Sequence, residues 1–297
     1  MLDGIRRLPE HERMVTTLFY VDGYSHEQIA GFLEVPVTTV NNRLHASRKR
    51  LKERMLNMVE DALKTNAPDE RWSRKVIDQL LGRPRPLEME GHPVRQVWDA
   101  IRASLPDYEV VTGEEVTRRE QFIELPSDWG AAYKLSEEQG LRTETTMVTL
   151  AAMRDRTPPM RLLTAGRVFR SEAEDAFHAK VFHQADGLCV EAGADVEALK
   201  TVVHRVLLAV LADCELRWRD EDYPVVQPSF EVEVRSADEW RSVCGCGMLR
   251  PEVLREAGHD PDAVTGWAFG VGLDRLAMLK HGIDDIHSLW RPPYVLR

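Results

Sequence analysis

The sequence predicts an α+β protein in which a small all-helical domain precedes a larger domain with an antiparallel sheet flanked by helices. In the first 64 residues apolar side chains recur at helical spacing, whereas the segment 166–234 contains runs that alternate as strands do. Between them, the proline-rich stretch 82–86 disfavours helix and marks a boundary. We expect a helix-turn-helix domain at 1–64, a helical linker at 65–86 and the sheet domain at 87–297.

Composition and charge narrow the classes of protein. The 297 residues are 43% hydrophobic, and no run of 18 apolar residues or signal-like N-terminus occurs, so we expect a cytoplasmic protein without membrane contact. The net charge is −10, but the first 64 residues carry ten Lys and Arg against nine Asp and Glu. An acidic body with a locally basic N-terminal domain suggests that any nucleic acid is met by that domain. The four cysteines lack metal-ligand spacing, which favours reduced structural thiols.

The N-terminal domain has the outline of a helix-turn-helix. Residues 8–20 predict a helix with Pro9 at its first position, because proline there loses no internal hydrogen bond. Ser25 and Gln28 form a capping box for a second, short helix. Thr38 can cap a third helix, whose apolar residues recur on one side and leave the polar ones for readout.

This segment closely resembles region four of extracytoplasmic-function sigma factors, which reads the −35 promoter element. In that family the residues after the third helix's cap enter the major groove, and later basic residues contact phosphates. A dimerisation or docking module is the alternative, and both interpretations stay open. The resemblance implies duplex DNA binding by Thr38, Thr39, Asn41, Asn42, Arg43 and Arg48.

The larger domain alternates helix and strand patterns. The centre is a predicted hairpin, 166–190, with a charged tip in which Arg170 and Glu172 leave the strand on one face. Arg170 offers a planar fork for phosphate oxygens, and Phe182 offers a flat apolar surface for a base. An exposed, salt-bridged hairpin is the alternative for this pattern alone. Around it we expect a helix from residue 93, a strand at 108–111, a helix at 195–211, and strands at 216–219 and 230–234.

Three blocks of this domain resemble the class II aminoacyl-tRNA synthetases, in the form of the phenylalanyl-tRNA synthetase α subunit. F-R-S-E at 169–172 with F-H-A-K-V-F-H-Q-A-D-G at 177–187 is similar to motif two, and G-V-G-L-D-R at 270–275 to motif three. C-G-C-G-M-L-R-P-E-V at 244–253 is similar to the active-site strand. Residues 91–116 resemble motif one, which forms the dimer interface, with Glu114 where the family has proline.

The resemblance implies a class II fold, a homodimer, and activation of an amino acid by ATP with Mg²⁺. In the family, Arg170 would bind the α-phosphate and the substrate carboxylate, and Arg275 the γ-phosphate; both are the implied catalytic residues. Ser242 stands where the family places a second acid for Mg²⁺. The other implied contacts are His178 to the phosphates, Glu172 to the adenine amino group, Phe182 to the adenine ring, Gly270 and Gly272 beside the nucleotide, and Glu231 to Mg²⁺.

The same resemblance places an amino acid beside the nucleotide. Glu144 stands where the family has histidine, and it can pair with a substrate ammonium, with a cationic side chain, or simply act as an acid at a helix start. The enzymes for phenylalanine have two phenylalanines and a glutamate where this chain has Tyr223, Val225 and Gln227, so we doubt phenylalanine as substrate. The remaining implied contacts are Gln184 and Asp186 to the amino group, Thr146 to the carboxylate and Ala268 to the side chain.

Two functions therefore remain. The first is a homodimeric enzyme that makes an aminoacyl adenylate, with transfer to tRNA left open. The second is a DNA-binding regulator whose synthetase-like domain senses an amino acid or its adenylate.

Overall fold

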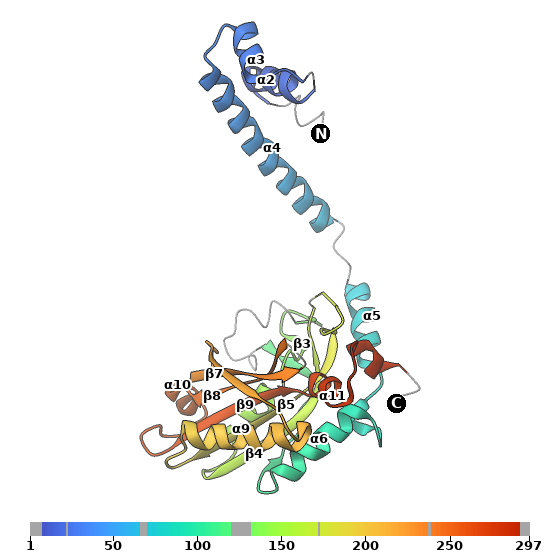
Figure 1. Ribbon diagram of the computed structural model, residues 1–297, viewed down its shortest axis with the longest axis vertical. Coiled ribbons are helices and arrows are strands. Elements are labelled where there is room, and N and C mark those ends of the chain that lie inside the picture. Colours follow the sequence, from blue (N-terminus) through green and yellow to red (C-terminus); the bar gives the residue numbers. More distant parts are fainter. Residues whose placement is uncertain are drawn as a thin grey trace. The chain divides into compact units, whose positions relative to one another are not determined.

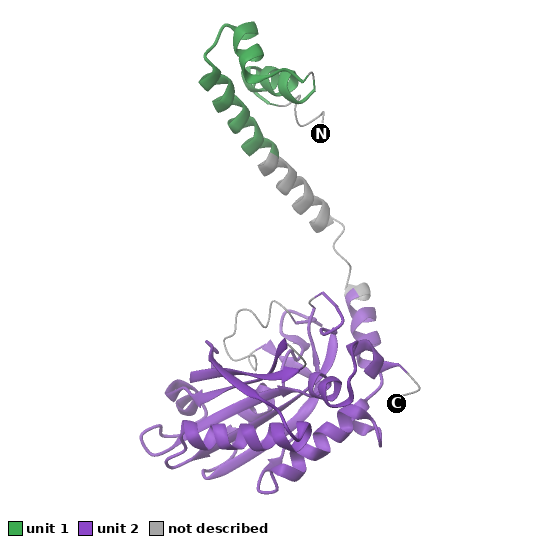
Figure 2. Cartoon of the chain, viewed as in Figure 1, with its two compact units in different colours: residues 1–69 green, residues 70–297 purple. Residues whose placement is uncertain are grey.

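The computed structural model describes residues 8–21, 23–65, 70–119, 132–171, 173–236 and 239–291, and their side chains except those of 52–72. The chain divides into two compact units, Met1–Asp69 and Glu70–Arg297 (Figure 2). Each is described by itself. None of the helices among the described residues is both long and apolar enough to cross a lipid bilayer.

The first unit consists of helices around a small apolar core. Ser25 caps the second helix, and the predicted capping box with Gln28 is present. Thr38 is not a cap, because the carbonyl of Pro36 already accepts hydrogen bonds from the amides of residues 39 and 40, so the helix begins directly after the proline. Its helices are α2 (Glu10–Tyr20), α3 (His26–Leu33) and α4 (Val37–Thr65), and Val15, Ile29, Ala30, Val40 and Leu44 form the core.

The second unit is built on a mixed sheet, seven-stranded in the described part of the chain, with the order β1-β4-β5-β9-β8-β7-β6 (Figure 1). Only the short edge strand β1 runs parallel to its neighbour β4, and the other pairs are antiparallel. The strands are β1 (Glu109–Val110), β4 (Met160–Phe169), β5 (Val181–Glu191), β6 (Leu216–Asp220), β7 (Val226–Ser236), β8 (Glu239–Leu249) and β9 (Thr265–Gly272). A two-stranded sheet pairs β2 (Val116–Arg118) with β3 (Gln139–Leu141).

Helices cover both faces of this sheet. Helices α6 (Pro93–Ser104), α9 (Val196–Leu211) and α11 (Leu273–His281) lie across one face (Figure 1). Helices α8 (Thr146–Arg154) and α10 (Pro251–Glu256) pack against the other face. Helix α5 (Glu70–Leu81) is followed by the short 3₁₀ helix η1 (Pro86–Glu88), and the 3₁₀ helix η3 (Ile286–Trp290) follows α11. This arrangement confirms the predicted fold class.

Successive side chains of β8 and β9 point to opposite faces of the sheet. Cys244, Cys246, Phe269 and Val271 face the core under α6, α9 and α11, where burial excludes water. The alternate positions carry glycine or small residues. Those positions form the open part of the other face.

The apolar stripe of α9 supplies a direct test of the core. Leu207 is fully buried, whereas its neighbour Leu208 is half-buried. We expect Leu207→Ala to reduce the free energy of unfolding of the second unit by about 3 kcal/mol, because the change leaves a cavity in a packed core. Leu208→Ala is the matched control and should cost less than about 1 kcal/mol. Urea denaturation followed by tryptophan fluorescence measures both, and equal losses would contradict the assigned face.

Candidate active site

The floor of the candidate site is one row of residues across four adjacent strands. Asp186 of β5 is in register with Gly270 of β9, Gly270 with Gly245 of β8, and Gly245 with Glu231 of β7. Residues in register point to the same face of a sheet. Two carboxylates therefore stand at the ends of a row whose middle has no side chains.

The two glycines in the middle of the row let neighbouring side chains lie close to the main chain. A Cβ on Gly270 would lie 3.0 Å from the side chains of Gln184 and Asp186, and one on Gly245 would lie 3.0 Å from the Tyr223 ring. Sequence reasoning named Gly270 and missed Gly245. The alternation C-G-C-G could have revealed it, since it places glycine at every second position of a strand.

A cavity of about 360 Å³ lies over this floor. Gln227 does not line it; the side chain is exposed and its Oε1 accepts a hydrogen bond from Arg250 Nη2 at 2.9 Å. Glu172 lies outside the described residues. The cavity brings together the other predicted residues of the larger domain: Glu144, Thr146, Arg170, His178, Phe182, Gln184, Asp186, Tyr223, Val225, Glu231, Ala268, Gly270, Gly272 and Arg275.

Two arginines face one end of the cavity. The Arg170 guanidinium lies over the Phe182 ring, 5.1 Å from its centroid, and its Nε donates to the carbonyl of Thr143 at 3.2 Å. Arg275 Nη1 donates to the carbonyl of Ser242 at 3.0 Å, and Nη2 lies 3.3 Å from His178 Nε2. Burial lowers the pKa of Arg275 from its ordinary value, and nearby Glu231 opposes this. Both cations are thus fixed in position beside the glycine floor.

Asp186 is held by two threonine hydroxyl groups. Thr146 Oγ1 donates to its Oδ1 at 2.6 Å, and Thr145 donates to its Oδ2. Burial raises the pKa of Asp186 to about 6, although the two threonines favour the ionised form. Sequence reasoning missed Thr145, whose only signal was its place beside Thr146 at a helix start.

Glu231 is held by two hydroxyl groups. Tyr223 donates to Oε2 and Ser242 donates to Oε1, so each carboxylate oxygen already accepts a hydrogen bond. Among the described residues, no group of three or more His, Cys, Asp or Glu side chains could hold a metal ion. Mg²⁺ in nucleotide sites is commonly held by one or two carboxylates together with substrate phosphates, so the single carboxylate of Glu231 would be its protein ligand when a nucleotide is bound. The hydrogen bond from Tyr223 to Glu231 also holds the Tyr223 ring beside Gly245.

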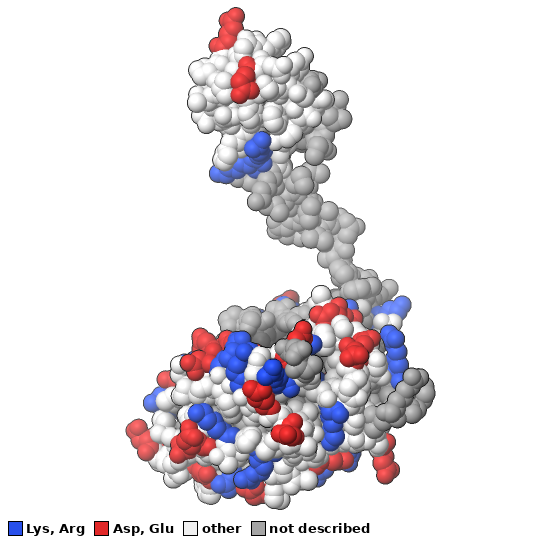
Figure 3. Space-filling model, in the orientation of Figure 1, with Lys and Arg blue, Asp and Glu red and all other residues white. Residues whose placement is uncertain are grey.

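The residues predicted to contact DNA lie on the first turns of α4, in the other unit. Thr38, Asn41 and Asn42 are exposed, and Thr39 and Arg43 are half-buried. Arg48 is also exposed, and its Nε donates to the Tyr20 hydroxyl at 2.5 Å. On the face in view in Figure 3, the basic side chains of this unit gather at one edge.

Comparison with known proteins identifies the family. The model of the class II tRNA synthetase core domain (F) matches residues 37–295, and that of sigma-70 region 4 matches residues 1–51. The chain is 31% identical over 278 residues to a phenylalanine–tRNA ligase alpha subunit of Rhodopseudomonas palustris, covering 82% of this chain and 77% of that one. The alpha subunit of Prochlorococcus marinus is 32% identical over 263 residues, covering 84% and 78%.

Solved structures agree in fold. Pyrrolysyl-tRNA synthetase from Desulfitobacterium hafniense superposes with a TM-score of 0.55 at 17% identity, covering 80% of this chain and 84% of that one. Because the family model matches residues 37–295, the chain belongs to the class II tRNA synthetase core-domain family.

Proposed function

We propose that this protein activates an amino acid with ATP, forming an aminoacyl adenylate and pyrophosphate. Class II synthetases are ligases that use ATP, and the relatives named above are tRNA ligases, so we propose tRNA as the acceptor. The observation that carries the proposal is the single cavity in which Arg170, Arg275 and Asp186 meet over a glycine floor. Residues 87–297 would be the catalytic domain and 65–86 its linker.

The side chains present fit ATP as a substrate. Arg170 and Arg275 supply two guanidinium groups for phosphate oxygens, and Phe182 supplies a half-buried ring for the base. The glycines at 245 and 270 let Tyr223, Gln184 and Asp186 lie close against the main chain at the floor of the cavity. Glu172 would receive the adenine amino group, and His178 would contact the phosphates.

The chemistry needs little covalent help from the protein. A carboxylate oxygen of the amino acid attacks the α-phosphorus, the new P–O bond forms, and the bond to the β-phosphate oxygen breaks to release pyrophosphate. The arginines hold the two anions in line and stabilise the charge that develops on phosphorus. Asp186 and Gln184 would hold the substrate ammonium, and Thr146 would contact its carboxylate.

The pocket for the substrate side chain favours an amino acid other than phenylalanine. Val225 is smaller than the phenylalanine of related enzymes, and Tyr223 carries a hydroxyl already bonded to Glu231. Ala268 would form the base of this pocket and Glu144 a charged wall. We propose a homodimer through residues 91–116, where a second cavity of about 640 Å³ adjoins Gly113 and Glu114.

Pyrophosphate exchange tests activation directly. Labelled pyrophosphate should enter ATP only when the correct amino acid is present, which a screen of standard and modified amino acids would identify. Arg275→Ala should reduce kcat/KM by at least about 100-fold, because a fixed cation at the reacting phosphates is lost. Arg235→Ala is the control, since its side chain is exposed on β7 and paired with Glu215. Absence of exchange with every amino acid would refute the proposal.

The pKa of Asp186 predicts a pH dependence. Because burial raises that pKa to about 6, the carboxylate gains a proton as the pH falls through this value and can no longer hold an ammonium group. We expect kcat/KM for the amino acid to fall about tenfold for each pH unit below that pKa. Asp186→Asn should be slow and lack this acid limb. An unchanged limb in Asp186→Asn would show that another group titrates.

A second function is favoured by the sigma-70 region 4 match and the exposed residues on α4. We propose that residues 1–64 bind duplex DNA, with the synthetase-like unit sensing an amino acid or its adenylate. The phosphates would meet Arg48, and base edges would meet Asn41, Asn42 and their neighbours.

Selection from random duplexes followed by fluorescence anisotropy measures this binding. We expect affinity to fall steeply with salt, and Arg48→Ala to reduce the slope of log K against log salt by about 1. Asn42→Ala should relax sequence preference. Lys200→Ala in the other unit should change neither. No binding of the full-length chain even at low salt would end this second proposal.

A further inference from the structure

Residues 142–146, here called the substrate segment, run from the end of β3 into the first residue of α8 and contact two groups of the site. The carbonyl of Thr143 accepts from Arg170 Nε at 3.2 Å. Thr145 and Thr146 both donate to Asp186. The positions of Arg170 and Asp186 therefore depend on where this short segment lies.

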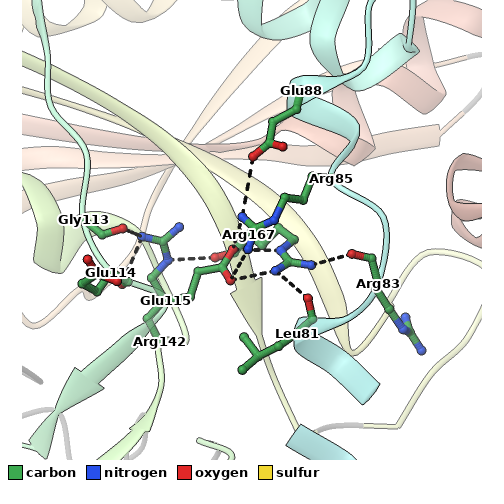
Figure 4. A network of polar contacts seen from close by, with 9 residues as sticks. All are labelled: Leu81, Arg83, Arg85, Glu88, Gly113, Glu114, Glu115, Arg142 and Arg167. Atoms are coloured by element: carbon green, nitrogen blue, oxygen red, sulfur yellow. Dashed lines mark hydrogen bonds and ion pairs between the residues drawn. The ribbon is translucent and has the colours of Figure 1, made fainter. Parts of the chain in front are cut away.

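Arg142 anchors the start of the substrate segment. Its side chain is 3% exposed, Nε donates to the carbonyl of Arg167 at 2.8 Å, and Nη1 donates to the carbonyl of Gly113 at 3.1 Å (Figure 4). Its own amide donates to the carbonyl of Glu115, and its carbonyl accepts from the amide of Phe169, both at 2.9 Å. One residue thus ties the substrate segment to β4 and to the segment before β2.

The fit of this guanidinium depends on a glycine. A Cβ on Gly166 would lie 1.9 Å from Arg142 Nη2, which is far inside van der Waals contact. Gly166 is in register with Gln184 on β5, a residue that lines the cavity. Any side chain at 166 would displace Arg142 without removing its charge.

A buried ion pair extends the contacts toward α5. Arg167 is 2% exposed, and its Nε and Nη2 donate to the two carboxylate oxygens of Glu115 at 2.8 and 2.7 Å. The same guanidinium donates to the carbonyls of Leu81 and Arg83, at and just after the end of α5 (Figure 4). Arg85 also reaches Glu115, at 3.3 Å through each Nη. A bidentate pair of this kind fixes orientation as well as charge.

We propose that Arg142 is a positioning residue for amino-acid binding, which acts by holding the substrate segment and is itself linked through Arg167 and Glu115 to residues 81–85. The proposal rests on the proposed function for its kinetic consequence. Its structural part does not, because the contacts of Arg142 exist without substrate. A change at residues 81–85 would then reach Arg170 and Asp186 through a continuous set of hydrogen bonds.

The full-length protein with Gly166→Ala tests the proposal, because the new methyl group moves the Arg142 guanidinium. We expect the KM for the amino acid in pyrophosphate exchange to rise about tenfold, since hydrogen bonds to Asp186 are lost. The KM for ATP should rise less, because only Arg170 of the two arginines is bonded to the segment and Arg275 is held by Ser242. Amide hydrogen exchange should accelerate in peptides covering 142–153. Peptides from α9 should be unchanged.

Further variants keep the test decisive if Gly166→Ala folds poorly. Glu115→Gln removes the charge that orients Arg167, whereas Glu114→Gln changes an exposed neighbour and is the matched control. Glu115→Gln should reproduce the exchange and KM effects more weakly, and Glu114→Gln should show neither. Arg142→Lys should resemble Gly166→Ala in these effects, because an ammonium group lacks the planar fork with which Nε and Nη1 meet the carbonyls of Arg167 and Gly113.

The outcomes separate the two proposals. Unchanged amide exchange at 142–153 in folded Gly166→Ala, or equal acceleration in α9, would overturn the role of Arg142. Wild-type protein without any pyrophosphate exchange would refute the activation proposal alone, and the amide-exchange result would still decide whether Arg142 holds the segment. An equal rise in the KM of ATP and amino acid would assign the contacts a purely structural role.

Discussion

The site depends on the absence of side chains from one face of β8 and β9. Gly245 and Gly270 are side by side in the sheet, between the carboxylates of Asp186 and Glu231. The other face of the same strands carries Cys246, Phe269 and other apolar residues packed under helices. A register shift of one residue would bury glycines and expose those rings, so the alternation that opens the floor also fixes the register.

Much of the fold and the site follows from local pattern. Phe182, Gln184 and Asp186 are two residues apart, which predicts a common face of one strand, and the structure brings all three to the same cavity. Gln227 is placed in the pocket by the resemblance alone, and it does not line the cavity. The pairing of β7 with β8 shifts register between Val226 and Ser229, and within this irregular stretch Gln227 is exposed and bonded to Arg250.

Contacts between distant segments could not be predicted in this way. Thr145 meets Asp186 across 41 residues, and Arg142 meets the carbonyl of Arg167 across 25. Neither partner has a sequence signal that names the other, because each depends on how β3, β4 and β5 are brought together. The hydroxyl partners of Glu231 belong to the same class; only the fold places Tyr223 and Ser242 on its two oxygens.

The hydroxyl groups of Tyr223 and Ser242 also orient the carboxylate of Glu231. A carboxylate that accepts from Tyr223 and Ser242 is oriented toward them, and Arg275 is its nearby cation. Among the described residues, Arg170 and Arg275 are the two guanidinium groups that line the cavity and could compensate the charge of a polyphosphate. Arg170 takes its orientation partly from the carbonyl of Thr143, so the position of the substrate segment governs both the anion at phosphorus and the ammonium at Asp186. A small displacement at Arg142 would therefore affect both ends of the amino acid together.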